Sequence, residues 1–199
     1  MRKRNVTGMG SKTDFRKLKI QLISKIAPAG SVEEYFGDTA DKYEFWQPHL
    51  CGVCCVKMIA DAVYTTNSWS LAELVDTFVK TKAFRISGNG AVEGAFHYPM
   101  KKVLASLGIN SHVVRKISVP NMAARIENGA AVILSVDLGR ITSGDESGGH
   151  LVLVTNYNRD RDVFTVYDSL GLLGRNGVDN DMSSENLAYI SNCKGLIVG

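Results

Sequence analysis

The hydrophobic residues in the first two thirds of the chain recur at helical spacing in several segments. Four segments have this pattern: residues 51–64, 70–80, 96–107 and 118–129. The first is apolar apart from Lys57 and Asp61, which predicts a largely buried helix. Ser70 and Glu73 form a capping box at the start of the second, and Gly108 is placed to end the third.

The second half of the chain changes to the continuous apolar runs that are typical of buried strands. Strands are predicted over residues 110–116, 131–136, 151–157, 163–167 and 195–198. One more short helix is predicted near residues 183–189. Because helices cluster first and strands last, the pattern predicts the α+β class, with a helical N-terminal part and a mostly antiparallel C-terminal sheet.

The beginning of the chain differs from the rest in charge. Its first 30 residues contain eight Lys or Arg and a single acidic residue, Asp14, whereas the whole chain has a net charge of +3. This composition predicts a basic, flexible N-terminal extension over residues 1–40 and one folded domain over residues 41–199. Aromatic residues do not alternate with these cations, so nothing indicates a nucleic-acid partner.

Targeting and membrane segments are not evident in the sequence. Met1-Arg2-Lys3-Arg4 is basic, but the apolar stretch of about 7 to 15 residues found in a signal peptide does not follow it. No apolar run reaches the roughly 18 to 20 residues of a transmembrane segment. The four cysteines do not form the pattern of a secreted disulfide framework. We therefore expect a cytoplasmic protein, or one exported without a Sec-type signal peptide.

Cys51 is the candidate nucleophile. It stands where a loop is expected to turn into the apolar helix, and a helix N-terminus stabilises a thiolate through its free N–H groups and its dipole. Gly52 is expected to let the backbone approach a substrate closely. Cys54 and Cys55 lie one turn further along, where packing in the core is expected, and Cys54 is the alternative nucleophile.

The same segment also contains the residue types of a zinc site. His49, Cys51, Cys54 and Cys55 lie close together in the sequence, but a structural zinc site needs a second pair of ligands at matching spacing. No such pair occurs, because Cys193 is single and the other histidines are scattered. We therefore expect neither a metal ion nor a cofactor.

A histidine and an aspartate follow in the order that a thiol nucleophile needs. His150 opens one apolar strand, and Asp168 ends the next. If antiparallel pairing brings them together, His150 can take the proton of the Cys51 thiol while Asp168 fixes the tautomer of the imidazole. Gln47, four residues before Cys51, is the candidate oxyanion-hole donor together with the backbone N–H of the cysteine.

These segments together resemble the papain-like cysteine peptidases of the bacteriocin-processing (double-glycine leader) type. In that family a glutamine precedes a Cys-Gly pair that opens an apolar helix, as in Cys51-Gly52. A Gly-His pair then begins an apolar strand, as in residues 149–154, and a later strand ends in an aspartate. The chain departs from the family pattern in the position of the glutamine. The family has it about six residues before the cysteine, where this chain has Phe45, whereas Gln47 is four residues before Cys51.

The resemblance covers about residues 43–170. It implies a papain-like fold with the nucleophile at a helix N-terminus, and cleavage of a peptide or protein substrate through a Cys51–His150–Asp168 triad and an acyl-enzyme. It also implies cleavage after small residues such as Gly-Gly. Two alternatives stay open: an acyl or amide transferase that uses the same triad, and a non-catalytic papain-like binding module. The sequence does not indicate an oligomeric state.

Overall fold

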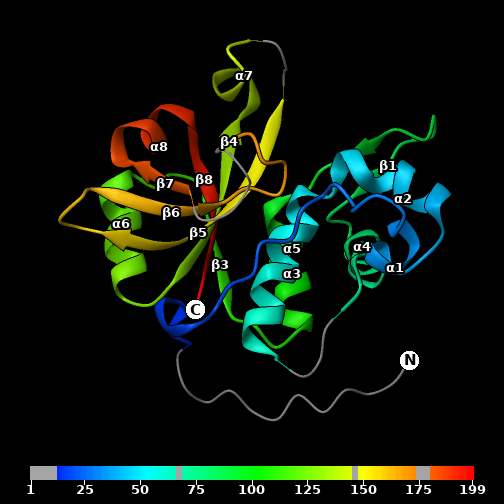
Figure 1. Cartoon of the computed structure of the whole chain (residues 1–199), viewed down its shortest axis with the longest axis horizontal. Coiled ribbons are helices and arrows are strands. Elements are labelled where there is room, and N and C mark those ends of the chain that lie inside the picture. Colours follow the sequence, from blue (N-terminus) through cyan, green and yellow to red (C-terminus); the bar gives the residue numbers. More distant parts are fainter. Residues whose placement is uncertain (1–12, 66–68, 145–147, 174–179) are drawn as a thin grey trace.

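The computed structural model describes residues 13–65, 69–144, 148–173 and 180–199 (Figure 1). Its helical elements are η1 (Phe15–Lys17), α1 (Val32–Phe36), α2 (Ala40–Trp46), η2 (Gln47–His49), α3 (Cys51–Val63), α4 (Leu71–Lys80), α5 (His97–Ser106), α6 (Val119–Glu127), α7 (Leu138–Ile141) and α8 (Ser184–Ile190). Its strands are β1 (Arg85–Ile86), β2 (Val92–Glu93), β3 (Ser111–Val114), β4 (Ala131–Asp137), β5 (Gly149–Asn158), β6 (Val163–Tyr167), β7 (Asn180–Ser183) and β8 (Ser191–Val198).

A six-stranded sheet organises the described residues, in the order β3-β8-β4-β5-β6-β7. Every neighbouring pair in it is antiparallel. Strands β5 and β6 are adjacent, and Tyr167 lies opposite Leu153. Asp168 follows Tyr167 directly, so this register brings it to the end of the sheet where β5 begins at Gly149 and His150.

Helices cover both faces of the sheet (Figure 1). Ile133 of β4 and Leu153 of β5 belong to a core shared with α3, α4 and α5, whereas Val132 and Val154 belong to a second core shared with α6 and α8. Successive side chains of a strand point to opposite faces, so strands covered on both sides read as uninterrupted apolar runs. The α+β class and the antiparallel sheet predicted from the sequence are confirmed.

Local signals placed most elements correctly. Helix α4 begins with the predicted capping box, in which the Ser70 side chain accepts the N–H of Glu73 and the Glu73 carboxylate accepts the N–H of Ser70. Strand β8 is longer than predicted, because it begins at Ser191 and includes the polar residues before Gly195. Within the described ranges, no helix combines the length and apolar character needed to cross a bilayer.

The beginning of the described chain packs against the domain, which differs from the flexible extension expected over residues 1–40. Phe15 and Phe36 are each only 1% exposed, and the N–H of Phe15 donates to Gly129 O at 2.8 Å. Figure 1 shows the blue segment crossing in front of α3 on its way to α1. Apolar residues between the cations hold it there, including Leu18 and Ile20, so charge counting alone misjudged residues 13–40. Residues 1–12 of the expected extension lie outside the described part.

We expect Phe15→Ala to lower the free energy of unfolding by about 3 to 5 kcal/mol, because it empties a buried aromatic site. Ile26→Ala is the matched control in the same segment. Ile26 is 55% exposed, so its truncation should change the free energy of unfolding by less than about 0.5 kcal/mol. Urea unfolding followed by circular dichroism measures both. If both variants change the free energy of unfolding by the same small amount, the packing of this segment against the domain is contradicted.

Candidate active site

Cys51 is the first residue of α3, as the sequence predicted, but helical turns and not a loop precede it. The first bond of the helix runs from Cys54 N–H to Leu50 O at 2.8 Å. The N–H groups of Cys51, Gly52 and Val53 belong to the first turn of α3, so they have no carbonyl partner within that helix. N–H groups at a helix N-terminus and the helix dipole favour negative charge at the Cys51 sulfur.

Gly52 has a packing role that the sequence interpretation did not include. A Cβ on Gly52 would lie 2.9 Å from the Ala95 Cβ and 3.1 Å from the Leu151 Cδ1. The residue is buried, and it allows α3 to approach both β5 and the chain before α5 closely. The absence of a side chain therefore brings the Cys51 end of α3 close to the beginning of β5.

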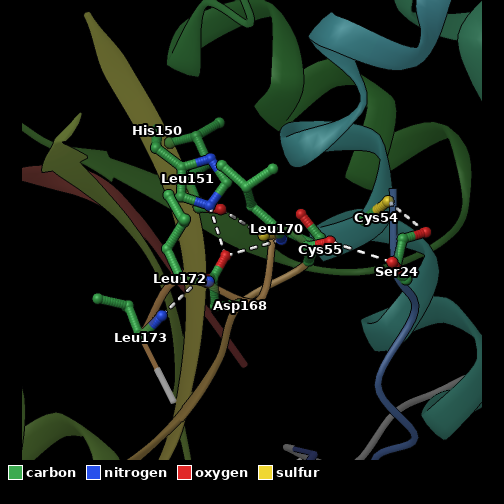
Figure 2. A network of polar contacts seen from close by, with 10 residues as sticks. Ser24, Cys54, Cys55, His150, Leu151, Asp168, Leu170, Leu172 and Leu173 are labelled. Atoms are coloured by element: carbon green, nitrogen blue, oxygen red, sulfur yellow. Dashed lines mark hydrogen bonds and ion pairs between the residues drawn. The ribbon is translucent and has the colours of Figure 1, made fainter. Parts of the chain in front are cut away.

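His150 and Asp168 meet at the end of the sheet, as the antiparallel pairing requires. The His150 Nε2 lies 2.7 Å from Asp168 Oδ1, and their side chains are 3% and 0% exposed (Figure 2). This contact uses one ring nitrogen and leaves Nδ1 on the other side of the imidazole. His150 also lies close enough to the Cys51 side chain for each group to shift the pKa of the other.

The Asp168 carboxylate is held by backbone donors as well as by the histidine. Its Oδ1 accepts the N–H of Leu170 at 2.9 Å, and its Oδ2 accepts the N–H groups of Leu172 and Leu173 at 2.7 and 3.1 Å (Figure 2). Burial raises the pKa of this carboxyl, but the hydrogen bond and charge of His150 and the backbone donors lower it by more. The buried group is therefore an anion at neutral pH.

The pKa values of Cys51 and His150 shift in opposite directions. Burial raises the pKa of the Cys51 thiol, but the hydrogen bond and charge of His150, and a hydrogen bond from the backbone of Leu151, bring it below its usual value. Burial lowers the pKa of His150, but the hydrogen bonds with Asp168 and Cys51 raise it to about 9. Both shifts favour a thiolate beside an imidazolium.

The other two cysteines of α3 are in apolar surroundings. Both are fully buried, with the Cys54 Sγ 3.6 Å from Ser24 O and the Cys55 Sγ 3.6 Å from Leu151 O. Burial raises the pKa of each thiol, in contrast with the direction at Cys51. A raised pKa keeps these thiols protonated at neutral pH, and a protonated thiol is a poor nucleophile.

Sequence reasoning missed the N-terminal segment that passes beside these residues. The N–H of Lys25 donates to Ser169 O at 2.8 Å, and the Ser24 hydroxyl donates to the same oxygen at 3.3 Å. Beyond the effects of burial and His150, the positive charge of Lys25 further lowers the pKa of the Cys51 thiol. The apolar residues that alternate with polar ones before Lys25 were the available signal for an ordered strand-like segment.

Gln47 begins η2, one helical turn before Cys51, and is partly buried. Its side-chain amide makes no hydrogen bond with any residue that the structure describes, so its role in an oxyanion hole stays a prediction. Phe45, at the position where the family pattern expects a glutamine, is 46% exposed and packs edge-on against Trp46. It carries no hydrogen-bond donor in its side chain.

The zinc alternative gains no support from the geometry. Over the described ranges, no three His, Cys, Asp or Glu side chains come together as metal ligands would. His49 lies in η2 and Cys51 at the start of α3, but Cys54 and Cys55 point toward the carbonyls of Ser24 and Leu151.

Comparison with known structures identifies the fold. A C39-like peptidase from Bacillus anthracis superposes with a TM-score of 0.56 at 10% identity, covering 90% of this chain and 94% of that one. The peptidase domain of Streptococcus ComA, a bi-functional ABC transporter involved in quorum sensing, gives 0.55 at 11% identity, with 91% and 98% covered. A double glycine motif protease from an AMS/PCAT transporter, in complex with a leader peptide, gives 0.46 at 14% identity, with 74% and 82% covered.

Comparison by sequence identifies the family. A search of curated proteins gave no match. The family described as "Peptidase_C39 like family" matches residues 38–192, which is most of the chain and includes Cys51, His150 and Asp168. The chain therefore belongs to the Peptidase_C39 like family, and it is a cysteine peptidase with the papain-like fold.

Proposed function

We propose that Cys51, His150 and Asp168 are the catalytic triad of this peptidase and hydrolyse a peptide bond through an acyl-enzyme. The observation that carries the proposal is the position of the His150 ring, which contacts Asp168 through Nε2 and lies close enough to Cys51 for each group to shift the pKa of the other. A nucleophile, a base and a residue that orients the base are thereby joined in one chain of contacts.

In the first half of the reaction, the Cys51 thiolate attacks the carbonyl carbon of the scissile peptide bond and forms a C–S bond. The C–N bond then breaks, and the proton held by the His150 imidazolium passes to the leaving amine. Asp168 stabilises the imidazolium while it exists and holds the ring in the required orientation. The products of this step are a thioester on Cys51 and the free amine.

In the second half, neutral His150 takes a proton from water, and the resulting hydroxide attacks the thioester carbonyl. The C–S bond breaks, the acid product leaves, and Cys51 returns to the thiolate beside imidazolium. Negative charge forms on the carbonyl oxygen in both halves. The N–H groups at the start of α3 and the side-chain amide of Gln47 are the candidate donors to it.

The substrate proposed is a peptide or a protein segment, because the acyl-enzyme chemistry of the fold acts on amide bonds. Cleavage after small residues such as Gly-Gly is the expectation that follows from the resemblance. Transfer of the acyl group to an amine uses the same triad and differs only in the acceptor. Mass spectrometry separates the two: hydrolysis leaves a new C-terminal carboxylate even with added amine, whereas transfer gives the amide.

An epoxysuccinyl probe, which alkylates nucleophilic cysteines, should label the wild-type protein at Cys51. We expect Cys51→Ala to reduce labelling and peptide cleavage by about 1,000-fold or more, because the nucleophile is lost. Cys54→Ala is the matched control in the same helix and should stay within about threefold of wild type, because that thiol is buried and protonated. Labelling that survives Cys51→Ala but not Cys54→Ala would assign the nucleophile to Cys54.

The pH dependence of kcat/KM should be bell-shaped. The lowered pKa of Cys51 sets the acid limb, because activity falls when the thiolate is protonated. The raised pKa of His150 sets the alkaline limb near pH 9, because the imidazolium then loses the proton needed by the leaving amine. Asp168→Asn removes the charge that helps to raise this pKa, so the alkaline limb should move to lower pH.

The control for that variant is its thermal unfolding, which separates a shifted profile from a loss of folded protein. An alkaline limb that stays in place in a folded Asp168→Asn protein would rule out the proposed partnership between the carboxylate and His150.

A further inference from the structure

A groove of about 940 Å³ lies beside α5 and β3, and its lining does not include Cys51, His150 or Asp168. Its lining is basic and contains no carboxylate. The cations and histidines that line it are Arg85, Lys101, Arg115, Lys194, His97 and His112.

The four cations of the groove are available to a ligand. Arg85, Lys101, Arg115 and Lys194 are exposed, and none of them forms an ion pair with another residue in the described part of the chain. The Arg85 guanidinium instead lies 4.5 Å from the centre of the Phe96 ring. Like charges that share a groove without counter-ions favour an anionic ligand.

The groove follows a free edge of the sheet. Strand β3 is the terminal strand and pairs only with β8 among the described strands. Gly199 donates its N–H to Asn110 O at 3.1 Å, so the backbone groups of Asn110 face β8. In an antiparallel ladder, the backbone groups of successive residues face alternate sides. The N–H and C=O groups of Ser111 and Val113 therefore point away from β8. Residues 112–115 are consecutive and all line the groove, although their side chains alternate between faces.

We propose that this groove binds an acidic, extended segment of another protein, which adds to β3 as a further strand. The free N–H and C=O groups of the edge supply the ladder, and the surrounding cations select carboxylate side chains. Cations on an edge strand also discourage pairing between two copies of the same edge. Both effects can hold together, because the cations of the groove attract the carboxylates of an acidic strand and repel the cations of a second copy of this edge.

Binding is measured by fluorescence anisotropy with a fluorescein-labelled octapeptide of alternating Glu and Val. The protein is the full chain carrying Cys51→Ala, so the peptide is not cleaved and the result does not depend on the proposed triad. We expect binding at about 20 mM salt that weakens as salt screens the charges. Arg115→Glu with Lys194→Glu should weaken binding at least tenfold, by about 1.4 kcal/mol or more.

The matched control reverses two exposed cations outside the groove, Lys19→Glu with Lys80→Glu, and should change the affinity by less than about twofold. A second peptide, of alternating Glu and Pro, has the same charge but lacks half of the N–H donors, so it should bind at least about tenfold more weakly. Hydrogen exchange of the Ser111 and Val113 amides should slow when the Glu–Val peptide is added.

Several results would overturn the proposal. Equal binding of the Glu–Pro and Glu–Val peptides would show attraction between charges without an added strand. Equal weakening in the Lys19/Lys80 control would show that net charge alone is responsible. Absence of binding at low salt would leave the cations with the single role of protecting the edge. Tighter binding of a short oligothymidylate, lost in the Arg115/Lys194 variant, would assign the groove to nucleic acid.

Discussion

The hydrogen bond between His150 and Asp168 is the contact on which the arrangement of this site depends. It joins the first residues of β5 to the residue that follows β6, so it exists only because those strands pair in one register. The carboxylate is fixed in turn by three backbone N–H groups of the segment after β6. With the anion held there, the imidazole is oriented toward α3 and its protonated form is stabilised.

The three cysteines of α3 illustrate how position decides chemistry. Cys51 is at the helix N-terminus beside His150, whereas Cys54 and Cys55 are one turn further into the core, and the pKa shifts have opposite directions. The chain before α1 contributes to the same region, because Lys25 is fixed to the carbonyl of the residue after Asp168 and places a positive charge near the thiol. A segment that composition marks as an appendage is thus part of the setting of Cys51.

Much of this was accessible from the sequence, and the exceptions have physical causes. The capping box of α4 and the apolar strands β4 and β5 are local signals, so periodicity and spacing revealed them. The order of Cys51, His150 and Asp168 could be read along the sequence as well. The packing of Phe15 and the inward role of Gly52 depend on residues far away in the chain, namely Gly129 and Leu151. Tertiary contacts of this kind leave no local pattern in the sequence. The charge of the first 30 residues instead predicted a flexible extension.

The most direct measurement is the pH titration of the Cys51 thiolate by its ultraviolet absorbance, taken as wild type minus Cys51→Ala. If His150 and Asp168 together stabilise the thiolate, its absorbance should persist well below the ordinary thiol pKa of about 8.5. The midpoint should move up in a folded His150→Ala protein. A midpoint at the ordinary value in wild type, unchanged by His150→Ala, would contradict the ion pair at the centre of the proposed mechanism.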